Sequence, residues 1–304
     1  MPFPMSVLDC SRIMVDTRRL EKLMSLTKPG MTGDGPSDGT VQQRRSLALS
    51  GHRDMRRAGQ GKTRTAQRQA AIDSNWSALT PCQPATSSDK ATRQFNALAR
   101  STDVISRFDI LRTQLVQSYR TRSLTSLGIS APGTGAGASF AAAGLIASLA
   151  RRGDVRVIGL DLNLKAPALH RYFEVAPAGS MLDLLNGQVP PEEYLQRLTD
   201  TVVLGLGLPV SEMDFSTGFS ADDLSATLND IVDHYAPDMI ICDLPPLLKG
   251  DIALSACSHL DGVLLVANSR TTRAQDITSC ERLLSGQTEF LGVILNNYSG
   301  GEQV

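Results

Sequence analysis

Six short apolar segments, each long enough for one strand, alternate with longer amphipathic stretches in the later part of the chain. They are LTSLGIS (124–130), VRVIGLDL (155–162), TVVLGLGL (201–208), DMIICDL (238–244), GVLLVANS (262–269) and FLGVILNN (290–297). The stretches 138–152, 221–235 and 272–285 carry apolar residues at helical spacing. Strands that are apolar on both faces and separated by helices are typical of a covered parallel sheet. The pattern therefore predicts an α/β fold, a doubly wound and mostly parallel sheet with helices on both faces.

The chain that precedes these segments has a different character. Residues 25 to about 90 are rich in Gly, Ser, Thr, Gln, Arg and Pro and show little apolar periodicity, which is typical of disorder. A short helix is predicted near 16–26, in DTRRLEKLMSL, and the helical pattern SRFDILRTQLVQSYRTR (106–122) begins the folded part. We therefore expect a mostly disordered basic region, 1–92, followed by one α/β domain, 93–304.

Charge is distributed unevenly along the 304 residues, although the formal net charge is only −1. Residues 1–100 hold 16 Lys and Arg against 8 Asp and Glu, whereas the remainder holds 14 against 23. Seven arginines lie from Arg44 to Arg68, which fits either a solvated linker or a tether to an anionic membrane surface or an acidic partner. No aromatic side chains interleave these charges, so we expect no binding of nucleic acid.

The cysteines and the apolar runs bear on the compartment. The five cysteines are scattered and lack metal-binding spacing, which favours a reduced, cytoplasmic protein. The longest apolar run, 140–150, is far shorter than the roughly 20 residues that span a bilayer. The first residues lack the basic start and long apolar core of a signal peptide. We therefore expect a cytoplasmic location, with any contact to the inner membrane peripheral.

A Gly-rich turn, APGTGAGASF (131–140), lies between the first predicted strand and the helix that follows it. Gly133, Gly135 and Gly137 leave backbone N–H groups open to an anion, and the N-terminus of the helix adds positive potential. A purely structural turn rarely needs three alternating glycines. The pattern therefore indicates a phosphate site.

Two kinds of phosphate site fit the turn. In one, Gly-x-Gly-x-x-Ala from Gly133 to Ala138 is a dinucleotide fingerprint, and Asp161 would bind a ribose hydroxyl. In the other, Gly137-Ala138-Ser139 stands for the Gly-Lys-Ser of a P-loop. Ser139 would then reach Mg²⁺, and the lysine is missing.

The ends of two further strands favour the P-loop. DMIICDL ends in Asp243 before two prolines, as a Walker B strand does, and another strand ends in Asp161. Two acidic strand ends that converge on one loop suit a metal–triphosphate site better than a nicotinamide site. No Tyr-x-x-x-Lys or comparable set supports an oxidoreductase. We therefore expect Asp161 and Asp243 to be the catalytic residues, and these two with Ser139 to bind the metal.

The segments 130–175 and 238–275, which carry these motifs in order, resemble the bacterial tyrosine kinases of the CpsD/CapB type. The resemblance covers about 75–304 and implies a P-loop fold of the MinD/ParA kind with ATP or ADP and Mg²⁺ as ligands. Members of that family are cytoplasmic partners or domains of membrane polysaccharide co-polymerases and control chain length and export of capsule and exopolysaccharide. A Wzz-like co-polymerase is therefore the implied partner, and a homo-oligomer is the implied assembly.

The family motif also implies which positions contact the nucleotide. These positions are Gly133, Gly135, Ala136, Gly137, Ala138, Ser139 and Phe140. Asn296 closes the final strand, where the family's base-contacting asparagine often lies. An adenine contact and a plain strand-end turn are both open for Asn296.

Four departures from the family pattern bear on activity. Ala138 replaces the P-loop lysine, and Asp161-Leu-Asn163-Leu-Lys165 stands for Asp-x-Asp-x-Arg. The oligomerisation motif Glu-x-x-Arg-x-x-Arg aligns with Ser106, Asp109 and Arg112, and the terminal tyrosine cluster is reduced to Tyr298. Loss of one preorganised donor costs on the order of 10²–10³ in rate.

These departures predict a degenerate kinase that acts as a nucleotide-responsive or structural regulator of polysaccharide synthesis or export. The alternatives are an active ATP-dependent tyrosine kinase with a relocated cation, for which Lys165 is a candidate, and a dinucleotide-binding oxidoreductase.

Overall fold

The structure is a computed structural model that describes residues 14–15, 66–85, 101–122, 124–211, 214 and 220–297. The helix expected near 16–26, most of the basic tract, the domain boundary near 92 and Tyr298 lie outside the described residues. The predicted division of the chain into two regions stays a prediction.

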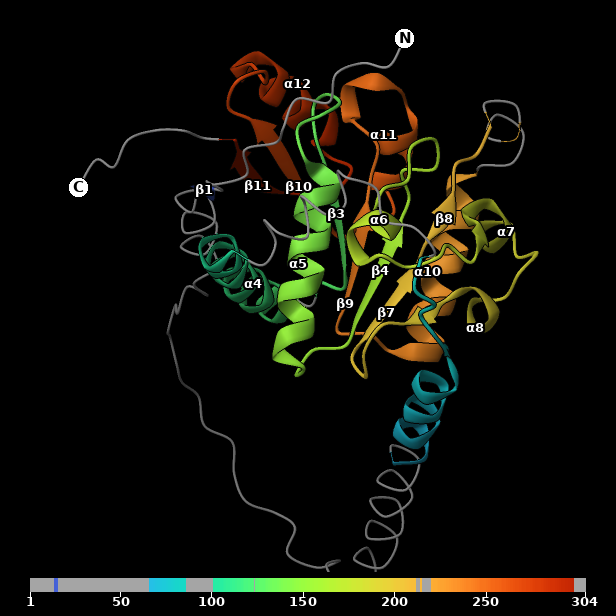
Figure 1. Cartoon of the computed structure of the whole chain (residues 1–304). Coiled ribbons are helices and arrows are strands. Elements are labelled where there is room, and N and C mark those ends of the chain that lie inside the picture. Colours follow the sequence, from blue (N-terminus) through green and yellow to red (C-terminus); the bar gives the residue numbers. More distant parts are fainter. Residues whose placement is uncertain are drawn as a thin grey trace, which may run out of the picture.

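A mostly parallel sheet forms the centre of the described structure (Figure 1), in the order β1-β11-β10-β3-β9-β4-β7-β6-β2. Its inner strands are β3 (Ser126–Ser130), β4 (Val157–Asp161), β7 (Val202–Gly205), β9 (Met239–Asp243), β10 (Gly262–Asn268) and β11 (Glu289–Asn296). Three short pieces lie at its edges: β1 (Met14–Val15), β2 (Thr80–Pro81) and β6 (Gln196–Arg197). The pairings among the inner strands are parallel, whereas β1 with β11 and β6 with β7 pair antiparallel. The predicted fold class is confirmed.

Helices cover both faces of the sheet, and the sheet separates two hydrophobic cores. The longer ones are α4 (Thr102–Arg122), α5 (Ala138–Arg152), α10 (Ala221–Tyr235) and α12 (Ala274–Leu284). The short ones are α6 (Leu169–Phe173), α7 (Met181–Leu185), α8 (Pro191–Tyr194), α11 (Ile252–Cys257) and the 3-10 turn η1 (Leu247–Lys249). A small second sheet joins β5 (Gly179–Ser180) to β8 (Gly207–Leu208). Side chains of α4, α5 and α6 pack into one core, and those of α7, α10, α11 and α12 into the other.

Neighbouring strand residues enter opposite cores, as two covered faces require. On β9, Ile240 packs with α10, whereas Ile241 packs on the side of α5. Within the part of the chain that the structure describes, no helix combines the length and apolar character needed to cross a bilayer.

A helix over residues 66–78 packs against the domain, although the sequence placed this stretch in the mostly disordered region. The indole Nε1 of Trp76, which is 2% exposed, donates to the carbonyl of Tyr235 at 2.7 Å. The Arg156 guanidinium lies 5.3 Å from the Trp76 ring centroid and forms a 2.6 Å ion pair with Asp73. β2 then continues along β6, so the disorder prediction does not hold for this stretch.

Candidate nucleotide-binding site

The Gly-rich turn lies at the carboxyl end of β3, directly before α5, as the sequence predicted. Gly135 has a φ of 77° and Gly137 a φ of 97°, a left-handed conformation that favours glycine. A Cβ on Gly137 would also lie 2.3 Å from Nδ2 of Asn296. Because α5 begins at Ala138, its first N–H groups have no partner within the helix. The loop therefore has the form of an anion site at a helix N-terminus.

The side chains of two asparagines hydrogen-bond to the backbone of this loop. Asn296 is 1% exposed, and its Nδ2 donates to the carbonyl of Ala136 at 2.9 Å. Nδ2 of Asn268 donates to the carbonyl of Gly135 at 3.5 Å. The sequence predicts a role for Asn296 but none for Asn268, although both end a buried apolar strand. The structure has Asn296 against the loop backbone, and its expected adenine contact stays a prediction.

The two predicted aspartates lie side by side. Asp161 and Asp243 are paired residues at the carboxyl ends of β4 and β9, and both are 0% exposed. Asp161 accepts the backbone N–H of Ala168 at 2.8 Å, of Leu169 at 2.9 Å and of Asn163 at 3.3 Å. It therefore holds the chain that enters α6, in addition to any role toward a ligand.

Asp243 has a different environment. Neither of its carboxylate oxygens accepts a hydrogen bond of good geometry from the described residues. Burial raises the pKa of Asp243 well above its ordinary value, the charge of Asp161 raises it further, and the nearby Ser139 hydroxyl opposes the shift. Burial likewise raises the pKa of Asp161 to about 6, against the N–H donors that lower it.

Two buried carboxylates beside a phosphate loop fit a divalent cation. A buried carboxylate without a partner is costly, and a cation would remove the cost at Asp243. Mg²⁺ is usually held by one or two carboxylates together with substrate phosphates. The described residues contain no cluster of three or more His, Cys, Asp or Glu that could hold a metal. The donor set of Ser139, Asp161 and Asp243 thus fits Mg²⁺ with a nucleotide.

The positions that depart from the family pattern bring little positive charge to this site. Ala138 is half-buried and packs against the core under α5. Asn163 is half-buried in the turn after β4, and Lys165 is exposed in the same turn.

Phe140 points into the core, where its ring centroid lies 5.6 Å from that of Phe108. Its contribution to the site is therefore to anchor the first turn of α5.

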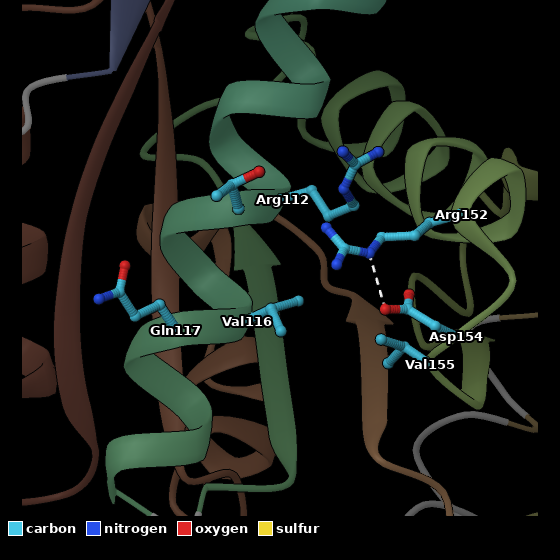
Figure 2. A pocket seen from close by; sticks show the side chains of 7 residues that line it. Arg112, Val116, Gln117, Arg152, Asp154 and Val155 are labelled. Carbon is cyan, nitrogen blue, oxygen red and sulfur yellow. Dashed lines mark hydrogen bonds and ion pairs between the residues drawn. The ribbon is translucent and has the colours of Figure 1, made fainter.

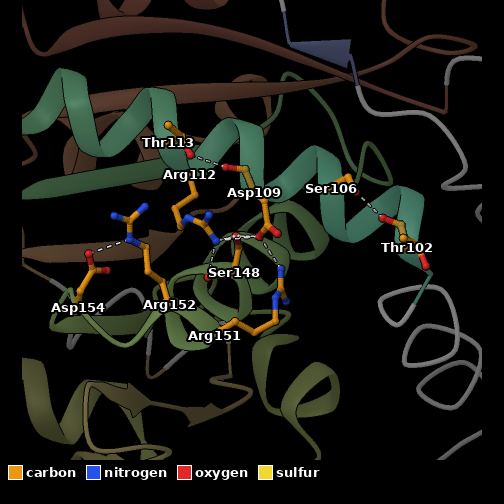
Figure 3. A network of polar contacts seen from close by, with 9 residues as sticks. All are labelled: Thr102, Ser106, Asp109, Arg112, Thr113, Ser148, Arg151, Arg152 and Asp154. Carbon is orange, nitrogen blue, oxygen red and sulfur yellow. Dashed lines mark hydrogen bonds and ion pairs between the residues drawn. The ribbon is translucent and has the colours of Figure 1, made fainter.

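Residues aligned with the oligomerisation motif join α4 to α5 within the chain (Figure 3). Oδ1 of Asp109 accepts from Arg112 at 2.8 Å, from Arg151 at 2.8 Å and from the hydroxyl of Ser148 at 2.5 Å. Partial burial would raise the pKa of Asp109, but the donors Ser148 and Arg151 hold it below its ordinary value. The hydroxyl of Ser106 donates to the carbonyl of Thr102 in its own helix.

A pocket of about 290 Å³ lies between α4 and the end of α5 (Figure 2). It is lined by Arg112, Thr113, Val116, Gln117, Arg152, Asp154 and Val155. Arg152 forms a 2.7 Å ion pair with Asp154 at its edge. Because Arg152 ends α5 and Ala138 begins it, the pocket is at the opposite end of this helix from the loop.

Comparisons with known proteins bear on this site. No protein-family model matches the chain. Over 189 residues, 61% of this chain, it is 27% identical to a putative tyrosine-protein kinase, EpsB, of Ralstonia nicotianae, and the match covers 24% of that protein. The chain is a relative of the bacterial tyrosine kinases. It spans about a quarter of the length of the kinases that it first matches.

Solved structures agree on the fold of this kinase relative. The kinase domain of the Escherichia coli tyrosine kinase ETK matches with a TM-score of 0.58 and 22% identity, over 66% of this chain and 79% of that chain. MinD of Pyrococcus horikoshii, solved with Mg-ADP, matches with a TM-score of 0.50 and 22% identity, over 59% of this chain and 72% of its own. The resemblance inferred from the motifs and the MinD-like P-loop fold are both confirmed.

Proposed function

We propose that this kinase relative is a nucleotide-binding regulator of bacterial exopolysaccharide or capsule biosynthesis or export, with weakened or lost phosphoryl transfer to tyrosine. The observation that carries the proposal is Asp243. Its carboxylate is fully buried at a strand end beside a phosphate loop, and only the nearby Ser139 hydroxyl among the described residues opposes the rise in its pKa, with no hydrogen bond of good geometry to either oxygen. A Mg²⁺–nucleotide complex is the ligand that would satisfy it.

Different residues of the chain would bind the phosphates and the metal ion. The loop from Gly133 to Ser139 would receive the phosphates of ATP or ADP through backbone N–H groups. Asp243 and the Ser139 hydroxyl would be the principal Mg²⁺ ligands, since the oxygens of Asp161 already accept N–H groups. When bound, Mg²⁺ supplies positive charge to the phosphates.

Weak phosphoryl transfer follows from what the site lacks. Ala138 cannot neutralise charge that develops on the transferred phosphoryl group, and Asn163 replaces a carboxylate. Loss of one preorganised donor lowers a rate on the order of 10²–10³-fold. An active kinase with a cation from elsewhere is the second candidate, favoured by the intact loop and by Lys165 in the turn after β4.

A dinucleotide enzyme is less well supported. It would need Asp161 to meet a ribose hydroxyl, as a fingerprint acid does. The carboxylate of Asp161 is fully buried and holds the N-terminal side of α6 instead.

The partners and location belong to the same proposal. A membrane polysaccharide co-polymerase of the Wzz-like kind would be the partner, at the cytoplasmic side of the inner membrane. The basic tract Arg44–Arg68 would contribute contact with anionic lipid. A homo-oligomer would form through surfaces other than the Asp109 carboxylate, which is engaged within the chain.

Titration of the full chain with ATP, ADP and NAD⁺, each with and without Mg²⁺, tests the function. We expect ATP and ADP to bind, more tightly with Mg²⁺, and hydrolysis to be slow. The variant Asp243→Ala should lose the effect of Mg²⁺ and keep the fold. Binding of NAD⁺ without binding of ATP or ADP would overturn the proposal.

A further inference from the structure

We propose that Asn268 and Asn296 are positioning residues that orient the phosphate loop, taking over part of the ordering that a lysine would otherwise give. The identity of the ligand rests on the proposed nucleotide function. The positioning itself rests on contacts between the two side chains and the loop backbone.

The two asparagines form a pair behind the loop. They are paired residues at the carboxyl ends of β10 and β11, and they are 6% and 1% exposed respectively. Asn296 donates to the carbonyl of Ala136, and Asn268 donates to the carbonyl of Gly135. Two consecutive peptide units of the loop are therefore held from one side.

Each amide is itself held in one orientation. Oδ1 of Asn296 accepts the N–H of Asn297 at 2.9 Å, and Oδ1 of Asn268 accepts the N–H of Arg270 at 2.9 Å. With each oxygen occupied by a donor, each Nδ2 is the group directed at the loop. The N–H of Ser269 also donates to the carbonyl of Asn296 at 2.9 Å, which ties the two strand ends together.

Holding a carbonyl fixes the N–H that follows it. A trans peptide unit is planar, and its C=O and N–H point in opposite directions. With the carbonyls of Gly135 and Ala136 turned toward the asparagines, the N–H groups of Ala136 and Gly137 point away from them. The site for an anion would lie on that side of the loop.

Gly137 is the residue that lets Asn296 come so close. Any Cβ there would lie 2.3 Å from Nδ2, and the φ of 97° disfavours a side chain independently. The contact of Asn296 with the loop thus requires a glycine at position 137, although the two residues are 159 positions apart in the chain. Since Ala138 brings no charge, binding of phosphate should depend strongly on the order of these N–H groups.

Hydrogen exchange of the ligand-free full chain tests the positioning. We expect Asn296→Ala and Asn268→Ala to speed amide exchange in a peptide covering 131–140, by about tenfold for the shorter bond of Asn296. The matched control is Asn75→Ala, because Nδ2 of Asn75 also donates to a backbone carbonyl, that of His234, at 2.9 Å. Exchange in 131–140 that matches the parent in both variants would overturn the proposal. Asn268→Ala, which removes the longer bond, carries the test if Asn296→Ala does not fold.

Comparing the affinities for pyrophosphate and for ADP separates a positioning role from contact with the base. A positioning role predicts that Asn296→Ala weakens pyrophosphate and ADP by the same factor, about tenfold. Loss of ADP affinity with unchanged pyrophosphate affinity would mean a base contact and overturn the positioning role. A parent that binds neither pyrophosphate nor ADP, while the two substitutions still speed amide exchange in 131–140, would mean that the nucleotide function fails. The positioning of the loop by Asn268 and Asn296 would then stand.

Discussion

Asp161 and Asp243 are paired residues on adjacent parallel strands, and both are fully buried, yet they differ in their partners. Asp161 accepts three backbone N–H groups, whereas Asp243 accepts no hydrogen bond of good geometry from the described residues. The first carboxylate is built into the turn that leads to α6. The second is available to a cation, so the two should respond differently to substitution and to pH.

We expect the ligand-free protein to lose stability as the pH rises. The pKa of Asp161 is raised from 3.8 to about 6 and that of Asp243 well above 3.8, chiefly by burial. A raised pKa means that the folded state holds its proton more tightly than the unfolded state. The stability that Asp161 contributes is present below about pH 3.8 and is lost as the pH rises through about 6. The raised pKa of Asp243 acts in the same direction.

Asp243→Asn should reduce this loss because it removes one of the two carboxyl groups whose pKa is raised by burial. Urea unfolding at pH 5, 6.5 and 8 would measure the free energy of unfolding of parent and variant. Asp222→Asn, an exposed carboxylate on α10, is the control and should follow the parent. An equally steep loss of stability in Asp243→Asn and the parent would contradict the assignment.

Ala138→Lys should tighten binding of MgATP by about tenfold or more, because a charged donor contributes about 1.5–3 kcal/mol to a buried hydrogen bond. The gain depends on the glycines of the loop and on Asp243, which are in place. Titration calorimetry measures it, and Ala138→Met, of similar length and without charge, is the control. Equal affinity in the two variants would mean that the loop does not act as a P-loop.

Tyrosine autophosphorylation should be absent. Three of the five tyrosines, Tyr119, Tyr194 and Tyr235, are at most 3% exposed, and Tyr172 is half-buried. A phenol oxygen must reach the terminal phosphate to accept it, which burial prevents. Mass spectrometry after incubation with ATP and Mg²⁺ is the measurement. Stoichiometric phosphotyrosine, at Tyr298 or elsewhere, would contradict the weakened-kinase interpretation.

Local patterns in the sequence predicted much of the fold. The helices α5 and α10 occupy the predicted ranges 138–152 and 221–235, because an amphipathic period is a property of the segment itself. The helix over 66–78 was missed because composition averages over a long stretch. Its one large anchor, Trp76, finds its partner Tyr235 far away in the chain.

For the candidate site, the sequence predicted the loop, the two acidic strand ends and their convergence, but not which strands are neighbours. Glycines in a turn and acids at strand ends are local signals, so the sequence could place the loop, Asp161 and Asp243 at strand ends, while their roles stay predictions. The pairing of these aspartates depends on strand order, which the sequence does not give directly. The contact of Asn296 with Ala136 also depends on strand order, because it requires the end of β11 to lie near the loop that follows β3.

Ser148→Ala should lower the free energy of unfolding by about 1–2 kcal/mol, since it removes a buried hydroxyl that bonds both Asp109 and Arg112. Urea denaturation measures the change. Ser106→Ala is the control, because its exposed hydroxyl bonds only the carbonyl of Thr102 and should matter by less than about 0.5 kcal/mol. Equal effects of the two substitutions would show that the α4–α5 network contributes little.

The basic tract should bind anionic lipid. Basic residues near a negatively charged bilayer contribute about 1 kcal/mol each, less for a flexible chain and at higher salt. Five arginines of the tract can be changed to glutamine without touching the described domain: Arg44, Arg45, Arg53, Arg56 and Arg57. We expect the full chain to co-sediment with vesicles that contain phosphatidylserine at low salt, and the glutamine variant to remain in the supernatant.

Vesicles of phosphatidylcholine alone are the control for this last prediction, since a charge-driven contact should not form on a neutral surface. Raising the salt from 50 to 200 mM should weaken the binding of the parent, because a shorter Debye length screens the arginines. Sedimentation that is the same for parent and variant, or the same on charged and neutral vesicles, would rule out the tract as a membrane tether.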